Sequence, residues 1–131
     1  PILQLAALEA ALDIWDTVDL HDLSAACLSL GDRFIAGVEA ACPTLRLVTP
    51  RAHDQRGSQI SFAHPEGYAI MQAMIAQGVI GDFRAPDILR FGITPLFVGE
   101  AEIDGAIAAL SDIMASGSWD KPEFKARAKV T

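Results

Sequence analysis

The chain has 131 residues, enough for one domain with a single hydrophobic core, and 51% of the residues are hydrophobic. Its formal net charge is −7, and residues 1–120 carry 16 acids against 6 arginines. This balance argues against nucleic-acid binding, which neutralisation of phosphates drives, and no apolar run approaches the roughly 20 residues of a membrane helix. We therefore expect a cytoplasmic protein that binds neither nucleic acid nor membrane.

Two helices are expected at the start of the chain. Residues 2–16 are rich in Leu and Ala, with Glu9, Asp13 and Asp16 on one narrow side. The apolar surface is wider than the stripe of a simple surface helix, which indicates a second partner outside this domain. We interpret 1–17 as an interdomain helix. Asp19 resembles an N-cap, and a second helix follows it to about residue 40.

The middle of the chain predicts short strands, with one helix among them. The helix begins at Pro65, the first helical position, and ends at Gly78, which is expected to be a left-handed cap. A last amphipathic helix covers about 100–115, and a tail at 117–131 is either solvated or packs back. Strands are predicted at 45–49, 58–62, 79–83 and 88–93.

The strands lie too close together along the chain for parallel crossovers at two places. This order of elements predicts an α+β fold, a mainly antiparallel sheet covered by helices on one face. We expect 1–131 to form a single domain. Removal of a methionine before Pro1 would explain the start of the sequence, but we expect instead a piece of a larger enzyme.

Arg90 is the candidate functional residue that the strand pattern singles out. In 88–93 the larger apolar residues alternate with Arg90, so Arg90 and Gly92 share the face opposite the core. The planar fork of an arginine suits bidentate capture of a carboxylate or phosphate, and a glycine beside it leaves room for a ligand. The alternative is a structural ion pair with Asp82 or Asp87.

The other polar residues are weaker candidates for a functional role. Arg84 is interpreted as a structural ion pair, and His64 as a helix cap, while His21 and His53 are expected to be plain surface residues. Neither the histidines nor the two cysteines have metal-ligand spacing, so no metal site is expected.

The cysteines, Cys27 and Cys42, are expected to be free buried thiols, with a disulfide as the alternative.

Three motifs are specific enough for comparison with known families: R-G-S-Q-I-S-F at 56–62, H-P-E-G-Y-A-I-M-Q-A at 64–73 and the stretch from 78 to 95. Together they resemble the C-terminal part of the kynureninase family. The opening P-I-L-Q-L-A-A-L-E-A-A-L-D-I-W resembles that family's helix between its large and small domains, and W-D-K-P-E-F resembles its tail. The resemblance covers nearly the whole chain.

The resemblance implies the small C-terminal domain of a fold type I pyridoxal-phosphate enzyme, a homodimer that cleaves L-kynurenine, or its 3-hydroxy form, to anthranilate, or its 3-hydroxy form, and L-alanine. It gives Arg90 the role of holding the substrate α-carboxylate, with Gly92 beside it. The cofactor-binding residues belong to a large domain absent from this chain, and the three lysines, Lys121, Lys125 and Lys129, match none of them. We expect no catalytic residue here, and an isolated chain that is inactive and binds no cofactor.

Two alternatives stay open. The chain could be the small domain of another fold type I enzyme, desulfurase-like or aminotransferase-like. It could also be a stand-alone regulatory module in which Arg90 captures the carboxylate of an effector.

Overall fold

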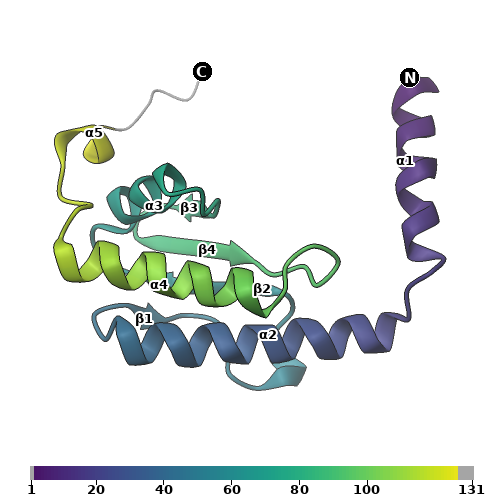
Figure 1. Cartoon of the computed structure of the whole chain (residues 1–131), viewed down its shortest axis with the longest axis horizontal. Coiled ribbons are helices and arrows are strands. Elements are labelled where there is room, and N and C mark those ends of the chain that lie inside the picture. Colours follow the sequence, from purple (N-terminus) through teal and green to yellow (C-terminus); the bar gives the residue numbers. More distant parts are fainter. Residues whose placement is uncertain (1, 127–131) are drawn as a thin grey trace.

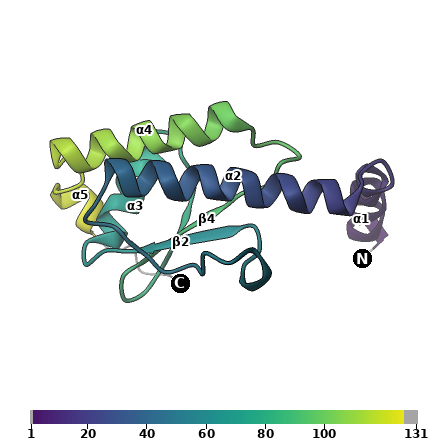
Figure 2. The same cartoon turned by 90° about the horizontal axis from the view of Figure 1, so that it is seen from below.

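Helices lie on one face of a four-stranded antiparallel sheet in the computed structural model, which describes residues 2–126 (Figures 1 and 2). Figure 2 shows α2 and α4 on the same side of strands β2 and β4. The α+β prediction is confirmed. In chain order the elements are α1 (Ile2–Trp15), α2 (Leu20–Ala41), β1 (Arg46–Leu47), the 3-10 helix η1 (His53–Gln55), β2 (Gln59–Ala63), α3 (Gly67–Ala76), β3 (Asp82–Arg84), β4 (Ile88–Gly92), α4 (Glu100–Ser116) and α5 (Pro122–Lys125).

The sheet order β1-β2-β4-β3 places β4 in the interior, between β2 and β3. Alternation along β4 buries Leu89 and Phe91 on the helix-covered face, as the pattern predicts. The ring of Phe34 from α2 meets Phe91 edge-on at 5.0 Å and Phe62 of β2 at 6.1 Å between centroids. These rings join α2 to the two interior strands and hold β4 in place.

The two long helices α2 and α4 are fixed to each other at their polar edges. Arg33 donates from Nε and Nη2 to the two carboxylate oxygens of Asp104, each at 2.7 Å.

At the start of α2, the Asp19 carboxylate accepts from the backbone N–H groups of His21 and Asp22 at 2.7 and 3.1 Å. The N-cap predicted at Asp19 is confirmed.

Three predicted element boundaries were wrong, each because a local hydrogen bond competes with the ladder or the helix. The helix begins at Gly67, not Pro65, because the Gly67 N–H donates to the His64 carbonyl in a turn. The first strand is shorter because the N–H groups of Val48 and Thr49 both point to the Ser61 carbonyl, as in a bulge. The third strand starts late because the Val79 N–H still caps α3 at Met74.

The left-handed cap predicted at Gly78 is confirmed by its φ of +86°. The tail turns back through Gly117, at φ +65°, and partly buries Trp119 and Phe124 against the core. The tail was expected either to be solvated or to pack back on the domain, and packing back is confirmed for 117–126. Residues 127–131 lie outside the described residues.

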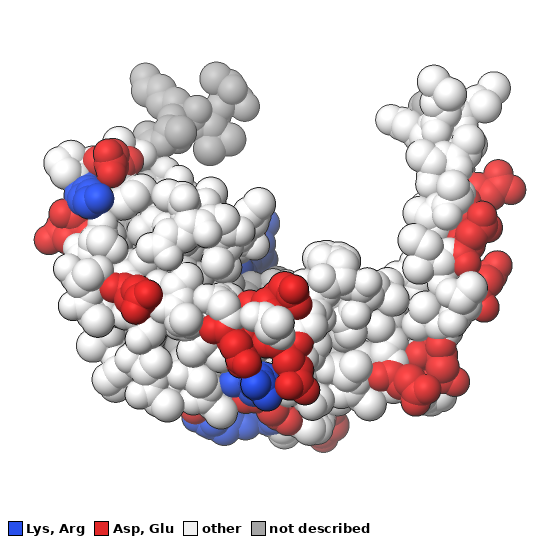
Figure 3. Space-filling model, in the orientation of Figure 1, with Lys and Arg blue, Asp and Glu red and all other residues white. Residues whose placement is uncertain are grey.

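Helix α1 stands away from the body and buries none of its residues (Figure 1). Figure 3 shows acidic side chains along its outer side and uncharged atoms on the side turned toward the body, with a hollow between the two. Its large apolar side chains are at least 44% exposed: Ile2, Leu3, Leu5, Leu8, Leu12, Ile14 and Trp15. An apolar surface of this size on one helix indicates a contact outside the described residues.

Gly81 is required where the chain enters β3. A Cβ built there would lie 2.8 Å from the Arg90 carbonyl oxygen and 2.7 Å from Met71 Cε. We expect Gly81→Ala to lower the free energy of unfolding by about 1–3 kcal/mol in urea titrations. Gly105→Ala is the matched control, because that helical glycine has open space around it and should gain up to about 1 kcal/mol. Equal effects of the two substitutions would contradict the close approach.

Candidate functional site

The uncovered face of the sheet carries a polar row across three strands. Ser61 of β2 and Asp82 of β3 lie directly opposite Arg90 of β4, one on each side. Because successive residues of a strand point to opposite faces, all three side chains lie on the face away from the helices. The prediction that Arg90 faces away from the core is confirmed by this register.

Arg90 makes an ion pair within the row. Its Nη2 donates to Oδ2 of Asp82, and Nε of Arg84 lies 3.5 Å from the same oxygen. The hydrogen bond from Arg90 is the largest cause that lowers the pKa of Asp82, and the charges of Arg90 and Arg84 add to it. The structure thus contains the ion pair that stood as the alternative for Arg90, and the structural pair predicted for Arg84.

The pair with Asp82 does not satisfy the whole guanidinium of Arg90. The side chain is 26% exposed, while its Nε is buried and has no hydrogen-bond partner within residues 2–126. A Cβ added at Gly92 would meet nothing within 4 Å, so space is open two residues along the strand. Gln59 lies opposite Gly92 and donates from Nε2 to the Ser61 hydroxyl at 3.3 Å. The face can therefore receive an acceptor of hydrogen bonds next to Arg90.

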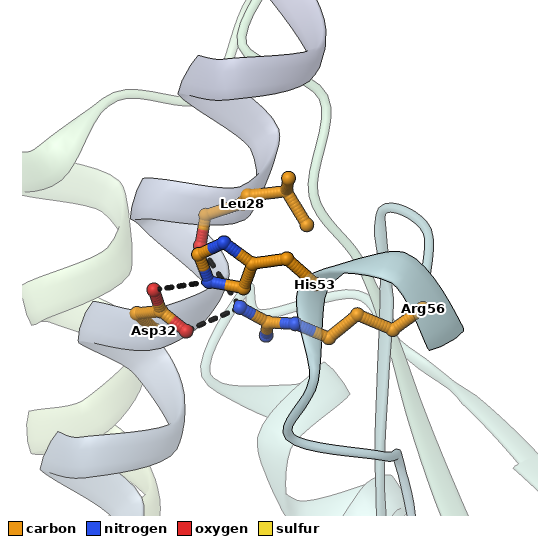
Figure 4. Close-up of polar contacts among 4 residues, drawn as sticks. All are labelled: Leu28, Asp32, His53 and Arg56. Carbon is orange, nitrogen blue, oxygen red and sulfur yellow. Dashed lines mark hydrogen bonds and ion pairs between the residues drawn. The ribbon is translucent and has the colours of Figure 1, made fainter.

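A second charged cluster joins the 51–57 loop to α2 (Figure 4). Arg56 is 1% exposed and donates from Nη2 to Oδ1 of Asp32 and, at 3.3 Å, to the Leu28 carbonyl. His53 Nε2 lies 2.8 Å from Oδ2 of the same Asp32. His53 is exposed, as predicted for a surface residue, and the structure adds the contact of its ring with Asp32 of α2. The burial of Arg56 was not predicted, since a polar loop gives no periodicity from which burial could be inferred.

His64 makes its contacts within the turn that precedes α3. Its Nδ1 accepts from the backbone N–H of Glu66 at 3.1 Å, and its ring meets Trp119 edge-on at 6.1 Å between centroids. The prediction of a helix cap at His64 was wrong, because the helix starts at Gly67 with Glu66 at its N-cap position, and His64 lies in the turn before it. Burial lowers the pKa of His64, and the Glu66 carboxylate offsets part of that effect.

The stability of the chain should therefore fall in mild acid. Because the pKa of His64 is lower in the folded state than its ordinary 6.5, the unfolded chain takes up the proton first as the pH falls. The free energy of unfolding should decrease below about pH 6.5 and level off once folded His64 also protonates. His64→Gln should remove this part of the pH slope in urea titrations, while the matched control His21→Gln, at an exposed position, should keep it. An unchanged slope in His64→Gln would contradict the assignment.

The residues described do not fit a pyridoxal-phosphate site. A lysine that binds this cofactor covalently must present a neutral amine in a pocket. Lys125 instead forms an ion pair with Asp120, which raises its pKa, and Lys121 lies 3.8 Å from Glu123 on the surface. Lys129 lies outside the described residues. No reaction step of this cofactor is assigned to the residues of this chain.

Within the described residues, no group of three His, Cys, Asp or Glu side chains could hold a metal ion, and no helix is long and apolar enough to cross a membrane. Both Cys27 and Cys42 are free, which confirms the thiol prediction over the disulfide. Cys42 is buried, whereas Cys27 is only partly so.

Fold and site together define a class, a small α+β domain that presents an arginine and a carboxylate on an uncovered sheet face. Residues 23–110 match the kynureninase C-terminal domain family, and the chain belongs to that family. It is 50% identical over 133 aligned residues to the kynureninases of Burkholderia mallei (strain SAVP1) and Burkholderia pseudomallei (strain K96243), and 46% identical to the kynureninase of Pseudomonas fluorescens.

Each of these alignments covers 100% of this chain but only 32% of the length of the relative aligned with it. The chain thus spans about a third of the length of the curated relatives it matches. Identity at this level over the whole chain favours the kynureninase family over the desulfurase-like and aminotransferase-like alternatives and over a stand-alone module.

Proposed function

We propose that this chain is the C-terminal domain of a hydrolase that cleaves L-kynurenine, or its 3-hydroxy form, to the corresponding anthranilate and L-alanine. Within it, Arg90 binds the α-carboxylate of the substrate, and Gly92 leaves the space for it. The observation that carries the proposal is the incompletely paired guanidinium of Arg90 on the uncovered sheet face, beside the open position at Gly92. Membership of the kynureninase C-terminal domain family supplies the reaction.

The cofactor of this proposal, pyridoxal phosphate, would be bound by a large domain outside the chain. About two thirds of the length of the relatives lies outside the alignment, which is enough for such a domain. The chain's own residues would contribute charge and orientation for the substrate. A cytoplasmic location belongs to the same proposal, and the two free thiols support it.

The experiment compares the complete polypeptide with the 131-residue chain. We expect the complete polypeptide to release anthranilate from L-kynurenine, or 3-hydroxyanthranilate from the 3-hydroxy form, and to show cofactor absorbance. The chain alone should do neither. Failure of the complete polypeptide on both substrates would refute the reaction, and cofactor absorbance in the pure chain would refute the assignment of the cofactor to a large domain.

The large domain of the same polypeptide is also the proposed occupant of the hollow beside α1. The β4–α4 connection projects toward α1 (Figure 1), and it exposes Phe97 to 79%. Phe97 and the 84%-exposed Ile80 line an apolar groove of about 540 Å³. Apolar surface is thus exposed both on α1 and at this groove, which suits an interdomain contact. In the complete enzyme we propose a homodimer, as in fold type I enzymes.

Without its large domain, the 131-residue chain should self-associate through α1. The exposed apolar side of that helix would gain free energy by pairing with a second copy. Light scattering at rising concentration should show dimers or larger species. The matched control is a chain that begins at residue 17 and should stay monomeric. A monomer for both chains would contradict the expectation.

A further inference from the structure

We propose that Asp82 is a positioning residue for Arg90: it holds the guanidinium over the sheet by one terminal nitrogen and leaves the rest of the fork to a substrate carboxylate. The inference rests on the function proposed above for Arg90. It concerns a different residue on a different strand, and it can be wrong while the role proposed for Arg90 is right.

The sheet register fixes this pair. Asp82 of β3 and Arg90 of β4 are direct cross-strand partners, and direct partners on one face have Cβ atoms about 5 Å apart. The carboxylate contacts only the end of the arginine, through Oδ2 and Nη2. A long, flexible side chain that is tied at its tip loses much of its rotamer freedom before a ligand arrives.

The contact leaves binding capacity unused. Nε of Arg90 is buried without a hydrogen-bond partner within residues 2–126, and a buried donor of this kind is costly unless an acceptor is supplied. Open space lies on the same face two residues along the strand, at Gly92. Because the side chain is 26% exposed and Asp82 contacts only Nη2, a ligand carboxylate could accept from the remaining terminal N–H groups without displacing Asp82.

The local charge also remains favourable to an anion. Asp82 lies between two cations, since Arg84 Nε is 3.5 Å from the same oxygen that Arg90 contacts. Within this group of three side chains, two arginines and one carboxylate leave one positive charge. Asp82 therefore orients Arg90 without cancelling the attraction for a carboxylate.

The test uses the complete polypeptide and two probes, L-alanine and L-alaninamide, which differ only in the charged carboxylate. Binding of each is measured by calorimetry in wild type, Asp82→Ala, Asp82→Asn and Arg90→Ala. We expect Asp82→Ala to lower the preference for L-alanine over L-alaninamide by about tenfold, since a misplaced binding group loses that order of effect. Asp82→Asn keeps a short acceptor at the same place and should recover part of the preference. Asp87→Asn, which removes an acid from the same hairpin, is the control and should leave it unchanged.

An unchanged or increased preference in Asp82→Ala overturns the proposal, because Asp82 would then be a bystander or a competitor of the ligand. The variant Arg90→Ala separates this failure from that of the proposed function. If Arg90→Ala lowers the preference and Asp82→Ala does not, only the positioning role falls. If Arg90→Ala does not lower it either, the carboxylate role of Arg90 falls and the role of Asp82 with it.

Discussion

Replacing Arg90 by alanine in the complete polypeptide is expected to lower kcat/KM for L-kynurenine by about 30- to 1000-fold. A charge-assisted, bidentate contact to a partly buried carboxylate contributes about 2–4 kcal/mol, and this free energy converts to that range of rates. The cofactor content should not change, because the substitution removes a group on the uncovered face of a domain that does not itself hold the cofactor. Steady-state kinetics and cofactor absorbance on the same preparations measure both.

Two further variants separate charge from geometry. Arg90→Lys keeps the positive charge and loses the planar fork, so we expect a loss nearly as large as in Arg90→Ala. Arg84→Ala removes the exposed arginine that shares the Asp82 oxygen and should change kcat/KM by only a small factor. Wild-type rates in Arg90→Ala would return Arg90 to the structural ion pair with Asp82.

The strand pattern predicted the face of Arg90 because alternation is a short-range property. Leu89 and Phe91 must turn inward to bury their side chains, so Arg90 must turn outward whatever the rest of the sheet does. The N-cap at Asp19 and the cap at Gly78 were predictable for the same reason, since each depends on a few neighbouring residues.

The choice between Asp82 and Asp87 as partner of Arg90 was not predictable from alternation. It depends on the register of β3 against β4, which places Asp82 opposite Arg90. Both acids lie close to Arg90 along the chain, and a shift of register by one residue would send Asp82 to the other face. The turn at 85–87 that joins the two strands sets this register, and the alternation of side chains within one strand does not contain it.

The burial of Arg56 was unpredictable for a different reason. The loop that carries it has no period, and its guanidinium is buried only because α2 and η1 meet over it. Arg56 opens the motif R-G-S-Q-I-S-F, which resembles the kynureninase family. The motif does not show that the Arg56 side chain is only 1% exposed.

Arg56 and Asp32 should respond very differently to substitution, although they form one ion pair. Asp32→Ala leaves the Arg56 guanidinium buried without its carboxylate, and such an uncompensated charge costs about 3–5 kcal/mol. Because Asp32 itself is about half exposed, water can reach part of the cluster, and we expect a loss near 3 kcal/mol in the free energy of unfolding.

Arg56→Met should be close to neutral or even stabilising, because two buried nitrogens of Arg56, Nε and Nη1, have no hydrogen-bond partner within residues 2–126. Methionine fills a similar volume without those desolvated donors, and replacing buried ions by apolar side chains often costs nothing. Urea titrations of both variants measure the difference, with His53→Ala as the control for the exposed side of the cluster, where a loss below about 0.5 kcal/mol is expected.

The double variant decides whether the charge or the packing of Arg56 matters. If the cost of Asp32→Ala is that of a buried unpaired guanidinium, Arg56→Met in the same chain should restore most of the lost stability, because no charge is then left to compensate. Two outcomes would contradict this explanation: a loss of unfolding free energy in Asp32→Ala no larger than in His53→Ala, or a double variant less stable than Asp32→Ala alone. Either would mean that the charge of Arg56 is not what makes Asp32→Ala costly. The loop from 51 to 57 would then be held to α2 by the hydrogen bond to Leu28 and by the packing of the Arg56 methylenes.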